Sequence, residues 1–224
     1  MKPRKKAHPT AERILAATLA LYNRFGEANV STGLISSELG ISPGNLYYHF
    51  PAKEELTNAL LERYMRTVEP LAQTAAEVSS LEDAWFLLHT WLEHIRDYRF
   101  IYRDISDLIS RNRHLEQQFR HLLDRKQQAM LGMVSGLERH GVIDISGSER
   151  ERLSGQLVFT INYWLNFEYA LQPRLDEQPE HAQQCLVRGA WQLLGLLAPY
   201  VRSDARQELD RLMRLYRLQA SPPR

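Results

Sequence analysis

The stretch from Ser31 to Lys53, STGLISSELGISPGNLYYHFPAK, constrains the fold of this chain more than any other segment. Ser31 is a candidate N-cap for a first short helix, because its hydroxyl can accept a hydrogen bond from a free backbone N–H group. Gly40 can end that helix, and Ser42 and Pro43 suit the cap and first position of a second helix. Two short helices joined by a glycine turn predict a helix-turn-helix, which places its second helix in the major groove of DNA.

The second of these helices carries groups suited to contact with DNA. Its first turn, Pro43-Gly44-Asn45, is small and lets the backbone approach a duplex closely. Tyr47, Tyr48 and His49 then offer phenol and imidazole groups that can bond phosphates or base edges. The alternative interpretation is a helical hairpin whose aromatic side chains only pack, and the length of the whole pattern disfavours it.

Residues 13–56 resemble the DNA-binding domain of TetR-family transcriptional regulators. The resemblance rests chiefly on Leu39-Gly40-Ile41-Ser42 and on the run Leu46-Tyr47-Tyr48-His49-Phe50 before a lysine. Residues 29–50 and, more weakly, 98–106 are also similar to a subgroup near polyhydroxyalkanoate-synthesis regulators. The resemblance implies an all-α fold in two domains. Residues 1–52 would form a tail and helix-turn-helix DNA-binding domain, and residues 53–224 a helical effector-binding and dimerisation domain.

The resemblance also implies a set of DNA-contacting residues. Phosphate positioning is expected from Thr32, Tyr48, His49 and Lys53, and base contacts from Pro43, Gly44, Asn45 and Tyr47. Ser31, at the start of the first helix, completes the set. Gly33 departs from the longer, often polar residue that many family members place there, which leaves base readout from the first helix unsupported.

Charge is distributed in a way that fits this interpretation. The whole chain has a net charge of only +1, but residues 1–53 carry seven positive and three negative side chains, a local net charge of +4. A basic end suits phosphate binding, which dominates DNA affinity. The Lys2–Lys6 cluster fits either a solvated tail or a tail that contacts DNA.

The rest of the chain shows helical periodicity. Pro70 is expected to bend or end a helix that begins near Ala52, and Ser79 and Ser148 are expected to open capping boxes. No segment approaches the roughly 18 apolar residues of a membrane span. The basic, partly apolar N-terminus lacks a cleavage site and predicts an amphipathic helix, not a signal peptide. A single cysteine fits a reducing, cytoplasmic location.

Two helices of the second domain are apolar around much of their circumference. They lie near residues 153–171 and 180–199. A helix that is apolar on more than one face needs more than one neighbour, so we expect a homodimer through these two helices. The alternative is a purely intramolecular core.

Polar residues embedded in apolar helices are candidates for an effector site, and each also has a structural interpretation. They are His89, Trp91, His94, Arg103, Asp107, Asn162 and Glu168. Aromatic and charged groups around an apolar cavity would suit a small-molecule effector of lipid-like character.

The sequence favours no enzyme, cofactor or metal site. It lacks a Glu-x-x-His pair and a glycine-rich phosphate loop. Cys185 is expected to be a buried, apolar helix residue with neither a base nor an orienting partner around it. We therefore expect a DNA-binding repressor released from a palindromic operator by an effector. The alternative is a helical carrier of small molecules or lipids without specific DNA binding.

Overall fold

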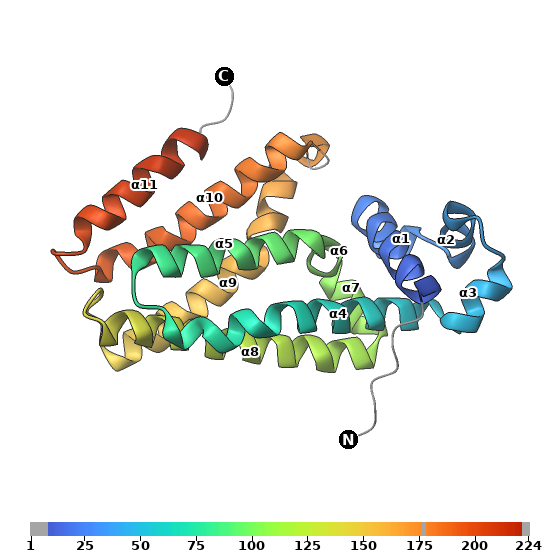
Figure 1. Ribbon diagram of the computed structural model, residues 1–224, viewed down its shortest axis with the longest axis horizontal. Helices are drawn as coiled ribbons and strands as arrows, with labels where there is room; N and C mark the ends of the chain where they lie inside the picture. Colours follow the sequence, from blue (N-terminus) through green and yellow to red (C-terminus); the bar gives the residue numbers. More distant parts are fainter. Residues whose placement is uncertain (1–8, 176–177, 221–224) are drawn as a thin grey trace. The chain divides into compact units, whose positions relative to one another are not determined.

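The computed structural model describes residues 9–175 and 178–220, and all regular secondary structure within these ranges is helical. This confirms the all-α expectation. The α-helices are α1 (Pro9–Phe25), α2 (Thr32–Leu39), α3 (Pro43–His49), α4 (Lys53–Thr74), α5 (Leu81–Asp97), α6 (Arg99–Arg103), α7 (Ile105–Arg111), α8 (Arg113–Arg139), α9 (Gly147–Leu171), α10 (Pro179–Leu197) and α11 (Arg206–Ala220) (Figure 1). The basic cluster at residues 2–6 lies outside the described residues. In the described part of the chain, no helix is long and apolar enough to cross a membrane.

The chain divides into two compact units, and each unit is made of two separate stretches of the sequence. The first contains the described residues up to Met65 together with Tyr98–Phe119. The second contains Arg66–Asp97 together with the described residues from Arg120 onward. Helices α6 and α7 therefore belong to the same unit as the helix-turn-helix. The functional boundary at residues 52 and 53 stays a prediction.

Aromatic packing joins α6 to α1 in the first unit. The rings of Tyr22 and Phe100 meet edge to face, with centroids 5.1 Å apart. The backbone N–H of Phe100 donates to the side-chain oxygen of Asn23 at 3.2 Å. Nearby, the buried hydroxyl of Tyr102 donates to that of Tyr64 at 2.7 Å. Edge-to-face rings and satisfied buried hydroxyls favour one fixed arrangement of these helices.

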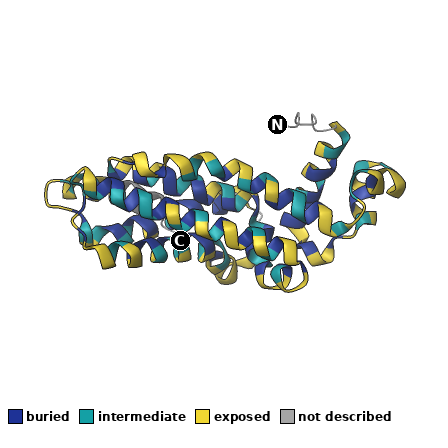
Figure 2. Ribbon diagram, turned by 90° about the horizontal axis from the view of Figure 1, so that it is seen from below, coloured by how far each residue is buried: buried dark blue, intermediate teal, exposed yellow. Residues whose placement is uncertain are grey.

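Helix α10 is the centre of the second unit. It packs against α5, α9 and α11, and α11 lies alongside it (Figure 1). Leu193, Leu194 and Leu197 of α10 are completely buried by these neighbours. Figure 2 shows the helices coloured by burial, with buried residues facing neighbouring helices and exposed residues facing outward. Burying each such leucine stabilises the unit by about 1.5–3 kcal/mol.

The structure corrects three expectations about helix ends. Pro70 lies inside α4, which continues to Thr74, so the predicted end of the helix at this proline is wrong. The capping box of α9 is formed by Ser146 and Glu149 instead of Ser148 and Glu151. At α5, Asp83 accepts from the N–H of Ser80 at 3.1 Å, so the cap lies one residue later than predicted. At α5 and at α9, two serines close together in the sequence allow two possible positions for the capping box.

Candidate nucleic-acid interface and effector-domain sites

Side-chain caps define both helices of the helix-turn-helix. The Ser31 hydroxyl accepts from the N–H of Leu34 at 3.1 Å, and the Ser42 hydroxyl accepts from the N–H of Asn45 at 3.2 Å. Between them, Gly40 adopts the left-handed conformation with φ of 64°. These are the local signals predicted from the sequence, and each satisfies backbone groups that a helix end leaves free. Ser31, predicted to contact DNA, is therefore also an N-cap.

Helix α3 has one buried face and one exposed face. Leu46 is completely buried, as is Ile35 of α2, and the two anchor the motif to its unit. Tyr48 is 83% exposed and Tyr47 is 45% exposed. Large exposed aromatic side chains on a short, firmly anchored helix are typical of a contact surface for another molecule.

Two pairs of predicted contact residues interact with each other. The Thr32 and Tyr47 hydroxyls are hydrogen-bonded at 2.9 Å, which joins the start of α2 to α3. The rings of Tyr48 and His49 lie edge to face, with centroids 5.1 Å apart. These contacts restrict the rotamers of the side chains, so less conformational entropy remains to be lost when a ligand binds.

Gly44 leaves the outer surface of the first turn of α3 open. A Cβ atom built there would meet only the Ser42 hydroxyl oxygen, at 4.0 Å. The protein's own packing therefore leaves room for a side chain at this position. Pro43, at the first position of α3, suits the helix start because its missing N–H needs no partner.

Lys53 lies in a network that sequence reasoning missed. Its ammonium donates to the backbone oxygen of Glu27 at 2.7 Å and lies 3.2 Å from the Glu27 carboxylate. Arg111 also donates to that carboxylate, whose side chain is only 3% exposed. An ammonium has three N–H groups, so a DNA phosphate that contacts Lys53 would have to share the ammonium with Glu27. Neither Glu27 nor Arg111 stood out by motif or periodicity.

The predicted effector residues do not form one site. Arg103 and Asp107 lie in the first unit, where Arg103 donates to the backbone oxygen of Asn23 at 3.2 Å and Asp107 accepts from Arg111 at 2.9 Å. The others lie in the second unit and are His89, Trp91, His94, Asn162 and Glu168. These seven residues were grouped by pattern alone, and the fold separates them.

His89 and His94 lie on α5, and both are partly buried. The His89 ring packs against Trp85 with centroids 5.2 Å apart, and its Nδ1 lies 3.8 Å from the Glu93 carboxylate. Burial lowers the pKa of His89, against a smaller opposite effect of Glu93. A desolvated imidazole favours its neutral form, which suits packing or hydrogen bonding more than charge recognition.

Trp91 and Asn162 both lie next to a buried lysine that the sequence analysis did not single out. Lys126 of α8 is completely buried and donates to the Asn162 side-chain oxygen at 2.6 Å. Its ammonium lies 5.9 Å from the centroid of the Trp91 ring. Burial lowers the pKa of Lys126 well below its ordinary value. Such a group costs free energy in an apolar core, and Lys126 is therefore a notable buried polar residue of the second unit.

The Lys126 substitution has a defined expected result. Its pKa is lower in the folded state, so the unfolded chain binds more protons and stability rises with pH towards the ordinary value of 10.5. Lys126→Met should remove this pH dependence between pH 7 and 9. Thermal unfolding of the wild type and the variant from pH 7 to 9 measures how the stability of each depends on pH. A variant that keeps the wild-type slope would contradict this result.

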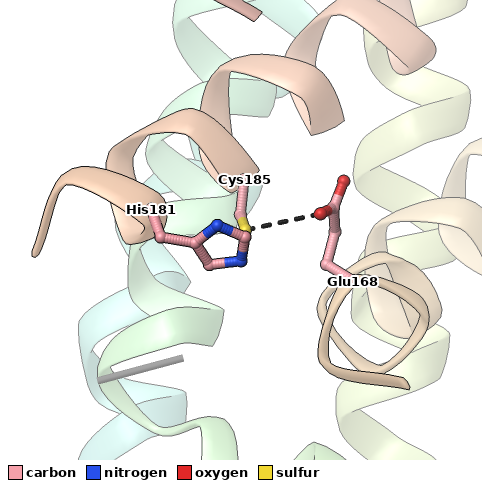
Figure 3. Close-up of side chains that lie close together, drawn as sticks. All are labelled: Glu168, His181 and Cys185. Carbon is pink, nitrogen blue, oxygen red and sulfur yellow. Dashed lines mark hydrogen bonds between the residues drawn. The ribbon is translucent and has the colours of Figure 1, made fainter. Parts of the chain in front are cut away.

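Glu168 takes part in a cluster between α9 and α10 (Figure 3). Arg188 donates to both of its carboxylate oxygens, at 2.8 and 2.6 Å. Cys185 and His181 face the same carboxylate from α10, with Sγ of Cys185 3.5 Å from Glu168 and 3.3 Å from Nε2 of His181. Cys185 is buried on a helix as predicted, but the expectation of neither a base nor an orienting partner around it is wrong, because His181 and Glu168 lie beside it. His181 lies one helical turn before it, a spacing visible in the sequence.

Burial, with help from Glu168, raises the pKa of the Cys185 thiol to about 12. A thiol that holds its proton at neutral pH is a weak nucleophile. The cluster borders a surface pocket of about 420 Å³ between α9 and α10. Its walls include Trp164, Phe167, Glu168, Leu171, His181 and Arg188. Aromatic and aliphatic walls with a few polar groups are typical of sites for small organic molecules.

Exposed apolar side chains, three of them aromatic, form a stripe along α9. Phe159, Tyr163, Phe167 and Leu171 recur every four residues and are 66%, 50%, 55% and 61% exposed. By contrast, most apolar residues of α10 are buried by α5, α9 and α11 of the same chain. An exposed apolar stripe of this kind is typical of a protein–protein interface.

The fold and the first unit define a class of protein, the helical regulators with an N-terminal helix-turn-helix. Residues 14–60 match the family model described as bacterial regulatory proteins, tetR family, and residues 63–209 match the model described as bacterial transcriptional repressor. The chain belongs to the TetR family.

Individual relatives agree with this assignment. The HTH-type transcriptional regulator UidR of Escherichia coli (strain K12) is 39% identical over 56 residues, which are 25% of this chain and 29% of UidR. The probable HTH-type transcriptional regulator ArpR of Pseudomonas putida is 24% identical over 140 residues, 61% of this chain and 66% of ArpR. A TetR-family regulator from Marinobacter aquaeolei VT8 superposes with a TM-score of 0.80 at 27% identity, covering 93% of this chain and 99% of its own.

Proposed function

We propose that the protein is a DNA-binding transcriptional repressor that acts as a homodimer on a palindromic operator. The supporting observation is the geometry of α3, which is capped at Ser42, anchored by Leu46 and exposed at Tyr47 and Tyr48. Family membership supports the same activity. Each protomer would place α3 in a major groove, with the two half-sites about one helical turn apart. Space above Gly44 would admit the DNA backbone.

Fluorescence anisotropy on the DNA upstream of the protein's own gene tests this proposal. We expect binding at least roughly 1,000-fold tighter than to a scrambled duplex, and a steep loss of affinity as salt rises, because phosphate contacts release counterions. If that DNA binds no better than the scrambled duplex, selection from a genomic library follows. Failure to select any sequence would favour the alternative of a helical carrier.

Phe159 and Tyr163, the part of the exposed α9 stripe that does not line the pocket, support a dimer with self-complementary contact. The ring centroids of Phe159 and Tyr163 lie 5.2 Å apart. The two rings would present a continuous aromatic surface to the same surface of a second copy. We propose that α9 supplies most of the aromatic area. The contribution of α10 would be smaller than the sequence suggested, because its own chain already covers most of its apolar residues.

Charge placed on this stripe should separate the protomers. In a two-fold interface each substitution occurs twice, so Phe159→Glu with Tyr163→Glu brings four carboxylates together. We expect the dimer dissociation constant to rise by roughly 100-fold or more. Sedimentation velocity measures it, and Phe86→Glu on α5, at a residue 62% exposed, is the matched control. An unchanged dimer in the double variant would place the interface elsewhere.

A small-molecule effector would release the repressor from DNA. The pocket between α9 and α10 is the best-defined candidate, since its volume of about 420 Å³ suits a small organic ligand. Trp164, Phe167 and Leu171 would hold an apolar, lipid-like part, and Arg188 a polar group. For release, the effector must bind the state with low DNA affinity more tightly than the DNA-bound state.

A further inference from the structure

Three different metal-ligating side chains meet between α9 and α10, and two of them, Glu168 and His181, also line the pocket. Cys185 offers a sulfur, His181 a ring nitrogen and Glu168 a carboxylate oxygen, and all three residues are buried. His181 and Cys185 lie one turn apart on the same face of α10, while Glu168 faces them from α9 (Figure 3). Two separate helices therefore bring one sulfur, one nitrogen and one oxygen donor to a single point.

Two of the three distances between the donor atoms match those around a coordinated ion. The three donor atoms all lie within 4.8 Å of one another. Sγ of Cys185 is 3.3 Å from Nε2 of His181 and 3.5 Å from the nearer oxygen of Glu168. Zinc binds such ligands at about 2.0–2.3 Å in a tetrahedron, whose donor atoms are then roughly 3.3–3.8 Å apart. Little movement of the backbone would be needed to close the site.

We propose that Glu168, His181 and Cys185 bind a thiophilic divalent metal ion of the zinc class. A sulfur, nitrogen and oxygen donor set selects zinc and its relatives over magnesium or calcium, which prefer oxygen alone. Three protein ligands leave the fourth position of the tetrahedron to water or to a donor from the pocket. The site does not depend on the proposed DNA contact of α3, because its three ligands belong to the second unit and α3 to the first.

Arg188 is the cation that balances Glu168 without metal. Its guanidinium donates to both Glu168 oxygens and, through Nη2, to the Cys185 sulfur at 3.4 Å. Its side chain is 22% exposed, so it can turn towards solvent. On metal binding, the ion replaces Arg188 beside Glu168, and the Cys185 thiol gives its proton to the buffer as the metal–sulfur bond forms. Arg188 thus competes with the metal.

Cobalt(II) is the probe for this site, because its thiolate complexes absorb in the near ultraviolet and its tetrahedral complexes absorb strongly in the visible. The chelator-treated, tag-free, reduced protein is titrated with cobalt chloride. Cys185 is the single cysteine of the chain, so any cobalt–thiolate band reports on this residue. We expect one cobalt ion per chain and loss of both bands when zinc is added.

Variants separate a built site from a lone thiol. Cys185→Ser should abolish the thiolate band, and His181→Gln and Glu168→Gln should each weaken cobalt binding by roughly tenfold or more. Arg188→Gln should tighten it, and the control His140→Gln should leave it unchanged. Circular dichroism checks that each variant is folded. Absence of the band in folded wild-type protein, or a band unaffected by both His181→Gln and Glu168→Gln, would overturn the proposal.

Discussion

Replacing both Lys53 and Arg111 with methionine is expected to lower the free energy of unfolding by about 3–5 kcal/mol. Both cations contact the carboxylate of Glu27, whose side chain is 3% exposed. Without them, a buried negative charge loses its two counter-ions, and desolvation is no longer offset. Each single variant should lose less, because the remaining cation still pairs with Glu27. Urea unfolding at pH 7 measures all three proteins.

Two further variants show whether burial causes this loss. Arg125→Met breaks the ion pair with Glu69, whose side chain is 41% exposed, and should cost no more than about 1 kcal/mol. Adding Glu27→Met to the double variant removes the buried charge and should restore most of the lost stability. If the double variant loses no more than Arg125→Met, the network is not a significant source of stability. In that case the role of Lys53 would be contact with DNA and not stabilisation of the fold.

Tyr48→Ala is expected to weaken binding to operator DNA by roughly 30- to 1,000-fold while leaving stability within about 0.5 kcal/mol of wild type. The side chain is 83% exposed, so its removal disturbs little of the fold. A phosphate contact contributes about 1–2 kcal/mol, and a dimer on a palindrome loses two of them. Phosphate contacts carry no sequence information, so affinity for scrambled DNA should fall as well.

Tyr48→Phe distinguishes the hydroxyl from the ring. If the hydroxyl bonds a phosphate, the phenylalanine variant should lose most of the affinity that Tyr48→Ala loses. Phe86→Ala, at an exposed aromatic residue on α5, is the matched control and should bind operator as wild type does. Anisotropy titrations at one fixed salt concentration compare the four proteins. Wild-type affinity in Tyr48→Ala would exclude Tyr48 from the DNA interface.

The sequence by itself determined the helix-turn-helix. Its signals are the caps at Ser31 and Ser42 and the turn at Gly40, and each acts through hydrogen bonds or backbone angles only a few residues away. Interactions of such short range depend on residues that are close together in the sequence, so they can be predicted without knowledge of the fold. Where two serines competed, as before α5 and α9, local signals left the register open by one or two residues.

Only the tertiary structure decided which polar side chains meet. Arg111 and Glu27 are 84 residues apart in the sequence, and Lys126 and Asn162 are 36 apart. The grouping of Glu168 with His181 and Cys185 depends equally on how α9 packs against α10. Packing of apolar faces sets these distances, and hydrophobic burial is non-directional, so periodicity reveals the faces but not their partners. The polar clusters of both units therefore became visible only once the helices were in place.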